Sequence, residues 1–317
     1  MTRMAMGWMQ RHDRARASAF LALLTAIMAL AFSALFIRWA EAPGVVFSFY
    51  RMAIPVVFLA WPFWRRVRKA GRLPARTVWL TVLSGAFLAG ELSMWATGVM
   101  LSGAVNPTLL ANMAPLWVGL GAWVFFREKL HTRFWVGLLL SMAGAAAILG
   151  LDSLREIQVG LGSLLGLLAA VFYAGYFLLT QRARQDLDSL ICLWISAASS
   201  TVCLLITSLA FQLPLTSYPL FSYLWFLAGG LITQVIGFLA LNYALGKIPA
   251  SLVSPSLLVS PVVTAVLAAW LLGEVLGALQ ILGGAAVLLG VVIVYLSRSR
   301  GGSGETRDAM RRVETSV

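Results

Sequence analysis

Two stretches of this chain share one pattern, AVNPTLLANMAPLWVGLGAWVFFREKL over residues 104–130 and ASLVSPSLLVSPVVTAVLAAWLLGEVL over residues 250–276. An offset of 146 residues superposes four like pairs in the same order: Pro115 with Pro261, Glu128 with Glu274, Gly137 with Gly283 and Gly144 with Gly290. Matches in order and in kind indicate an internal repeat, in which one structural unit occurs twice.

The composition places both units in a membrane. Of the 317 residues, 60% are hydrophobic and 11% charged, whereas a soluble domain carries roughly 25% charged residues. Apolar runs of ~20 residues are long enough to cross a bilayer as helices. We therefore predict an all-α membrane protein with ten transmembrane helices, near residues 18–37, 45–64, 78–99, 105–126, 134–150, 159–179, 190–211, 222–245, 250–272 and 278–296.

The basic residues predict the orientation. If the N-terminus is cytoplasmic, all but three of the 24 Lys and Arg residues fall in cytoplasmic segments, and Arg38, Arg51 and Arg155 are the exceptions. The positive-inside rule then places both termini in the cytoplasm. It also explains the net charge of +12 without a nucleic acid as partner, because the charges lie in short clusters between apolar runs.

Five spans per unit is an odd number, so the second unit enters the membrane inverted. We predict a cytoplasmic N-terminus over residues 1–17, a first five-helix repeat over 18–150, a second and inverted repeat over 151–297, and a disordered cytoplasmic tail over 298–317. The first apolar run exceeds the 7–15 residues of a signal-peptide core, which indicates a retained span.

Pro115 and Pro261 fall near the middle of equivalent spans. A proline inside a helix removes a backbone hydrogen bond and bends the helix. Paired interruptions in the two halves of a transporter mark its central site. Both prolines are therefore candidate kink or gating residues, with a purely structural kink as the alternative.

Several motifs together resemble the drug/metabolite transporter superfamily in its EamA-type branch. They are the FYR of Phe49–Arg51, the P-x12-E spacing of Pro115 to Glu128 and of Pro261 to Glu274, the LLGE that ends at Glu274, and the glycine-rich last helix of each half. The resemblance extends from about Ser18 to Leu296. The first span departs from the family pattern, since it lacks the usual Trp-Gly pair.

Among characterised members of that family, the chain is most similar to bacterial aromatic amino-acid exporters. The resemblance implies a cavity between the halves, lined mainly by helices 1, 3, 4, 6, 8 and 9, and the export of amino acids or related metabolites by alternating access. It also implies the inner (plasma) membrane of a bacterium as the location. Multidrug or nucleotide-derivative export is the alternative that the same fold allows.

Two charged residues, Arg51 and Glu91, lie within predicted spans. Charges inside a membrane are costly and usually face protein, water or a partner. Glu91 is a candidate for binding a substrate amine or a proton. Arg51 is a candidate for binding a substrate carboxylate, or for a structural ion pair with Glu91.

Polar and aromatic residues complete the candidate binding site. Trp95 and Gly98 share a helix face with Glu91, so Trp95 can stack on a substrate and Gly98 can leave room beside it. The remaining candidates have side chains suited to bind a zwitterion or an aromatic ring. Alternatively, these side chains form hydrogen bonds between helices. They are Asn112, Tyr173, Tyr176, Gln234, Asn242, Tyr243 and Ser260.

The sequence has no nucleotide-binding loop and no set of catalytic residues within the spans, so we predict a secondary transporter rather than an enzyme. A scaffold without a substrate is the remaining class, and the mid-span polar residues argue against it. No cofactor or metal site is predicted, since Cys192 and Cys203 form no metal-binding motif. The expected partners are a small-molecule substrate, the lipid bilayer and, through Glu91, a proton, with facilitated diffusion or exchange equally open. The glycine stripes fit packing within a monomer or in a weak dimer.

Overall fold

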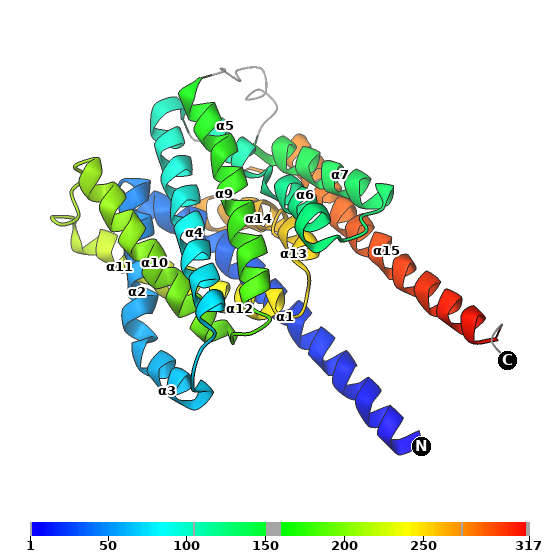
Figure 1. The fold of residues 1–317 in the computed structure, drawn as a ribbon. Helices are drawn as coiled ribbons and strands as arrows, with labels where there is room; N and C mark the ends of the chain where they lie inside the picture. The colour runs from blue at the N-terminus through cyan, green and yellow to red at the C-terminus, as the bar shows by residue number, and fades with distance from the viewer. Residues whose placement is uncertain (1, 104, 150–159, 274, 315–317) are drawn as a thin grey trace.

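The structure is a computed structural model that describes residues 2–103, 105–149, 160–273 and 275–314. Figure 1 shows one bundle of helices. Their bounds are α1 Thr2–Ala40, α2 Gly44–Phe58, α3 Ala60–Ala70, α4 Ala75–Ser102, α5 Val105–Ala111, α6 Ala114–Phe126, α7 Thr132–Leu149, α9 Leu161–Ala183, α10 Ser189–Ala210, α11 Leu220–Ala228, the π-helix η1 Gly229–Phe238, α12 Leu239–Leu245, α13 Ala250–Ser256, α14 Val259–Leu272 and α15 Ala278–Glu314.

Nine segments of the described chain are long and apolar enough to cross a membrane, or ten if α2 and α3, which meet at an angle of 56°, form one bent span. Their bounds lie within a few residues of the predicted spans. The N-terminal end of α1 and the C-terminal end of α15 emerge at the same end of the bundle (Figure 1). The count of ten and the cytoplasmic location of the termini remain predictions.

Each helix that carries a repeat proline is interrupted by a two-residue turn within one continuous candidate membrane span. Residues 112–113 separate α5 from α6, and residues 257–258 separate α13 from α14. Pro115 and Pro261 follow at the start of the second helix of each pair. Because Pro115 has no N–H, the carbonyl of Ala111 loses its helical donor. The two breaks occupy equivalent places in the repeats.

The glycine stripes pack within the chain. A Cβ atom on Gly137 would lie 2.7 Å from the Gly290 carbonyl oxygen, and one on Gly144 would lie 2.5 Å from the Gly283 carbonyl oxygen. In this contact residue numbers rise along α7 as they fall along α15, so the two helices are antiparallel. Ser141 donates to the Val287 carbonyl at 3.3 Å. The 146-residue offset converts the contact of Gly137 with Gly290 into the contact of Gly283 with Gly144. A two-fold axis between α7 and α15 requires this relation.

Both ends of the chain are more helical than predicted. Helix α1 begins at Thr2, within the segment predicted to precede the first span. Helix α15 continues to Glu314, where the sequence predicted a disordered tail. Hydrophobicity marks where a span ends in lipid, but it does not mark where the backbone stops being helical.

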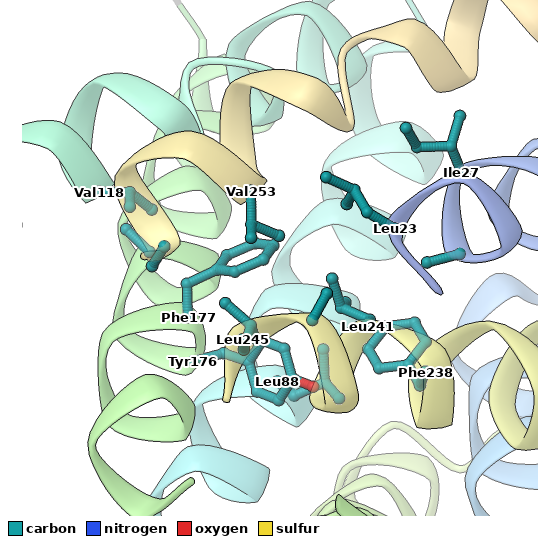
Figure 2. Packing of buried hydrophobic residues seen from close by; sticks show 14 of the residues in the cluster. Leu23, Ile27, Leu88, Val118, Tyr176, Phe177, Phe238, Leu241, Leu245 and Val253 are labelled. Carbon is teal, nitrogen blue, oxygen red and sulfur yellow. The ribbon is translucent and has the colours of Figure 1, made fainter. Parts of the chain in front are cut away.

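A core of apolar side chains fills the centre of one end of the bundle, and Figure 2 shows it from close by. Its buried members come from helices of both halves: Leu23 and Ile27 of α1, Leu88 of α4, Val118 of α6, Tyr176 and Phe177 of α9, Phe238 of η1, Leu241 and Leu245 of α12, and Val253 of α13. We call this set the closing core, because it separates the cavity described next from that end of the bundle.

Candidate functional site

A cavity of about 520 Å³ lies between the two halves, above the closing core. Residues of α1, α4, α9, η1 and the two broken pairs α5–α6 and α13–α14 form most of its wall. The cavity reaches the end of the bundle opposite the closing core, where Arg38, Leu149 and Gln280 line it. All six helices that the family resemblance implied contribute to it, together with Arg51 of α2.

Arg51 is only 5% exposed, and the neighbouring helices hold its guanidinium. Its Nε donates to Gln234 Oε1 at 3.1 Å, and its Nη1 donates to Ser33 Oγ at 3.1 Å. The guanidinium also lies over the Phe238 ring, 5.3 Å from its centre. Nη2 makes no hydrogen bond with the described residues. The arginine is therefore fixed in the wall with one donor group still available to a ligand.

Glu91 of α4 lines the same cavity. The predicted ion pair with Arg51 is wrong for this conformation, since no atoms of the two side chains lie within 4 Å of each other in an ion pair among the described residues. Ser33 and Gln234 instead accept hydrogen bonds from Nη1 and Nε of the arginine. The carboxyl group of Glu91 has no hydrogen-bond partner in the described chain. The cavity therefore has an acidic and a basic group on its wall that are not bonded to each other.

Trp95 lies one turn beyond Glu91 on α4 and also lines the cavity. Its Nε1 donates to Thr108 Oγ1 of α5 at 3.0 Å, which fixes the orientation of the indole ring. Gly98 was expected to leave room for a substrate, but a Cβ there would lie 2.8 Å from the Gly162 carbonyl oxygen. It allows α4 to approach α9 closely instead.

The two chain breaks bring polar groups to the wall. Asn112 lies in the first break, and Ser260 and Pro261 follow the second, all three on the cavity. The Asn112 amide nitrogen is buried without a hydrogen-bond partner in the described chain. A buried donor without a partner is costly. A ligand atom or a water molecule at the break would offset that cost.

Of the twelve residues singled out from the sequence, eight line the cavity: Arg51, Glu91, Trp95, Asn112, Pro115, Tyr173, Ser260 and Pro261. The other four do not line it in this conformation. Gln234 lies behind Arg51. Asn242 donates to the Tyr176 hydroxyl at 3.3 Å beside the closing core. Tyr243 is hydrogen-bonded to Ser18 at 3.0 Å near the end of the bundle.

Several residues of the cavity wall were not predicted from the sequence. Arg38 was assigned to a loop, yet it lies in the last turn of α1 and lines the cavity together with Ser33 of the same helix. Thr108, Phe177, Phe238 and Gln280 were also missed. Arg38 and Ser33 interrupt the first apolar run, a signal that could have marked both. The others sit in ordinary apolar or polar contexts that carry no such signal.

Below the closing core, polar contacts join neighbouring helices, and one of these contacts crosses between the two halves. Glu128, which follows α6, accepts a hydrogen bond from Ser251 of α13 at 2.5 Å. Arg184 at the end of α9 donates to the Asn242 carbonyl at 2.7 Å, and the side chain of Gln181 accepts from the Ala250 backbone N–H. We call these contacts the closing contacts. Glu274, the repeat equivalent of Glu128, lies outside the described residues.

Helices long enough to span a bilayer, a two-fold relation between halves and a ligand-sized cavity between them define a polytopic membrane transporter. In the described residues no group of three or more His, Cys, Asp and Glu side chains is arranged to hold a metal ion. The model of the EamA-like transporter family matches residues 17–150 and 160–296, so the chain belongs to that family and contains two copies of its repeat.

Relatives and structures agree with this assignment. The chain is 26% identical to the uncharacterised transporter YwfM of Bacillus subtilis (strain 168) over 68% of this chain and 72% of the relative. It is 27% identical to an uncharacterised transporter of Methanothermobacter thermautotrophicus over 69% of this chain and 65% of that relative. A solved crystal structure superposes with a TM-score of 0.74 over 88% of this chain and 98% of the other, at 19% identity, and supports the fold alone.

Proposed function

We propose that this transporter exports neutral or aromatic amino acids, or closely related small metabolites, across the bacterial inner membrane by alternating access. The observation that carries the proposal is the chemistry of the cavity wall. One carboxylate, Glu91, and two guanidinium groups, those of Arg38 and Arg51, lie on a surface that is otherwise mostly apolar. Binding a zwitterion requires one group of each sign on the wall. The apolar remainder of the wall is suited to an apolar or aromatic side chain of the substrate.

The geometry supports a zwitterion rather than an ion of one sign. Glu91 is suited to accept from a substrate ammonium, and the free Nη2 of Arg51 is suited to donate to a substrate carboxylate. Trp95 and Tyr173 offer flat surfaces for an aromatic side chain. The cavity volume of about 520 Å³ falls within the ~300–1,000 Å³ of typical small-molecule sites.

The arrangement of open and closed ends supports alternating access. The closing core and the closing contacts block one end of the bundle, while the cavity reaches the other. With the orientation predicted from the basic residues, the blocked end is cytoplasmic, and this conformation faces outward. Because the halves are related by a two-fold axis, exchanging their conformations generates a state open to the opposite side.

Glu91 also supports proton coupling. A carboxyl group at the cavity wall without a hydrogen-bond partner can bind either a proton or a substrate ammonium. If the proton and the substrate ammonium compete for this one carboxylate, the protein would carry one in each direction across the membrane. Facilitated diffusion and exchange remain outcomes of the experiment that follows.

The experiment is uptake of radiolabelled neutral and aromatic amino acids into proteoliposomes of the purified protein. We expect protein-dependent flux, and a pH-gradient dependence that Glu91→Gln abolishes. Trp95→Ala is expected to reduce the flux of aromatic substrates about ten-fold, since stacking and burial of one ring contribute roughly 1–2 kcal/mol. Thr108→Val keeps the ring and removes only the hydrogen bond that orients it, so its loss of flux should be smaller than that of Trp95→Ala.

Absence of flux above that of empty liposomes, from protein shown to be folded, would refute the amino-acid proposal. A panel of drugs and nucleotide derivatives would then be tested in the same liposomes. Flux that Trp95→Ala and Glu91→Gln leave unchanged would contradict the proposed binding site, and it would leave the fold and the family unaffected.

A further inference from the structure

The short helix α3 has a face that neither the closing core nor the cavity uses. Residues at positions i, i+3, i+4 and i+7 lie on one face of a helix, and in α3 these are Trp61, Trp64, Arg65 and Arg68. Trp61 and Trp64 are 68% and 57% exposed, and both arginines are exposed as well. The Arg65 guanidinium lies 4.6 Å from the centre of the Trp61 ring. We call this set the tryptophan–arginine face.

The opposite face of α3 is fixed to the bundle. Phe63 is buried and stacks on Trp194 of α10, with ring centres 3.9 Å apart and planes at 12°. Val67 packs against the same apolar cluster. Arg66 forms an ion pair with Asp188 at 2.6 Å. The helix is therefore held in one orientation, and that orientation turns the tryptophan–arginine face away from the protein.

The position of α3 relative to the bilayer follows from the length of α2. Helix α2 has 15 residues and is about 22 Å long, which is shorter than the ~30 Å hydrocarbon core. The chain then bends by 56° into α3, which Figure 1 shows slanting away at one end of the bundle. Helix α3 thus begins in the apolar layer and leaves it obliquely, at the depth where headgroups lie.

The nearby charge is strongly positive. Arg65, Arg68, Lys69, Arg72 and Arg76 are all exposed, and none of them forms an ion pair with another described residue. Two acidic residues near these cations are already engaged, Asp188 by Arg66 and Asp186 by the Thr77 hydroxyl at 2.6 Å. The cations on α3 and after it therefore have no compensation within the described protein.

We propose that the tryptophan–arginine face of α3, together with Lys69, binds the headgroups of anionic phospholipids. Tryptophan rings favour the membrane–water interface, and basic residues just outside a span attract anionic lipids at short range. The indoles insert beside the acyl chains while the guanidinium and ammonium groups contact the lipid phosphates. This site is separate from the cavity and does not depend on which substrate the cavity binds.

The test is native mass spectrometry of the full-length protein, titrated with phosphatidylglycerol or with phosphatidylcholine. We expect tighter binding of phosphatidylglycerol. Arg65→Gln, Arg68→Gln and Lys69→Gln together should weaken it roughly 100-fold, since each cation near the surface contributes about a five-fold factor. The matched control removes three cations between the end of α6 and the first turn of α7, Arg127→Gln, Lys129→Gln and Arg133→Gln, and should change binding less than about three-fold.

A second measurement separates lipid binding from simple anion binding. Brominated phosphatidylglycerol should quench part of the tryptophan fluorescence of the wild-type protein. In the double variant Trp61→Phe with Trp64→Phe, this quenched part should be absent. Inorganic phosphate should not displace the lipid. An unchanged melting temperature of the triple variant in detergent without added lipid would show that it is folded. Equal affinity for the two lipids, an equal loss in the control variant, or displacement by inorganic phosphate would overturn the proposal.

Discussion

Arg51 shows how a buried charge in a membrane protein can be held for a ligand. Placing a guanidinium in a span costs several kcal/mol unless it is hydrogen-bonded. Ser33 and Gln234 each accept one of its N–H groups, and the Phe238 ring covers part of its surface. These contacts hold the arginine in one orientation, and Nη2 makes no hydrogen bond with the described residues. The residue is thus structural and also available to a ligand.

From this arrangement we predict that Arg51→Gln raises the KM for phenylalanine at least ten-fold, because a charge-assisted hydrogen bond contributes roughly 1.5–3 kcal/mol. Inhibition of transport by phenethylamine, which has no carboxylate, should change little. Ser33→Ala is the control, since it removes one hydrogen bond and keeps the charge. Equal losses for phenylalanine and phenethylamine would show that Arg51 acts only on the packing of the helices.

At the scale of the helices, close backbone contact joins the two repeats. Helices α7 and α15 approach through Gly137, Gly144, Gly283 and Gly290, where backbone atoms of one helix occupy the space of a side chain on the other. Small residues at such contacts let helices in lipid gain van der Waals contact. At Gly137, Gly144 and Gly283 the atom nearest to an added Cβ is a backbone carbonyl oxygen, so turning a side chain would not relieve the contact.

Gly144→Ala should therefore destabilise the protein by about 1–3 kcal/mol, the usual cost of overpacking a tight contact. The measurement is thermal unfolding in detergent, read as a lower melting temperature. Gly277→Ala is the control, because a Cβ at Gly277 meets nothing within 4 Å. If both variants melted together, the close contact between α7 and α15 would not be a source of stability.

Helix α10 begins with a cap that depends on charge. The Asp188 carboxylate accepts from the backbone N–H groups of Leu190 and Ile191 at 2.8 and 2.9 Å. Burial by itself would raise the pKa of Asp188. The hydrogen bond and charge of Arg66, with the two N–H groups, outweigh it and hold the pKa below the usual value of an aspartate.

Because the pKa of Asp188 is lower in the folded protein, its contribution to stability is present above the unfolded value of about 3.9. That contribution is lost as pH falls through the folded pKa. At neutral pH, Asp188→Ala should cost about 1 kcal/mol, the usual loss of an N-cap. Asp188→Asn should cost less, because asparagine still caps. Melting curves at neutral and acidic pH check this prediction. The difference in melting temperature between the wild type and Asp188→Ala should be smaller in acid.

At the scale of the whole molecule, the cavity extends toward one end of the bundle and packed side chains close the other end. The closing core brings apolar residues of seven helical segments together, and the closing contacts lie beneath it. The hydrogen bond between Glu128 and Ser251 joins the first repeat to the second. Opening this end of the bundle requires that bond to break.

We predict that Glu128→Ala exposes the closing core more often. A cysteine in place of Leu245, which is 2% exposed, would report this in a background without Cys192 and Cys203. Labelling by a membrane-impermeant maleimide in inverted vesicles should become about ten-fold faster, since a hydrogen bond to a charged group contributes roughly 1.5–3 kcal/mol. Lys129→Ala is the control. An unchanged labelling rate in Glu128→Ala would exclude this contact as a determinant of closure.

Much of the architecture could be predicted from one sequence. Runs of ~20 apolar residues define spans because lipid cannot hydrogen-bond an exposed backbone. The 146-residue offset between Pro115 and Pro261 identified equivalent interruptions in the two repeats. The paired glycines identified the helix faces that pack tightly, but not which helix each face packs against. The site was harder, because a polar residue in a span faces either a cavity or a neighbouring helix, and its helix position alone does not distinguish the two. Asn112 faces the cavity, whereas Asn242 bonds to Tyr176.

The sequence by itself therefore determined the solvent of this protein, the approximate positions of its membrane spans and the existence of two like halves. Each of these depends on local composition or on self-similarity along the chain. Only the tertiary structure decided that Arg51 bonds to Gln234 rather than to Glu91, that the glycines of α7 meet those of α15, and which end of the cavity is closed. These outcomes depend on which residues, distant in sequence, compete for the same partner in space.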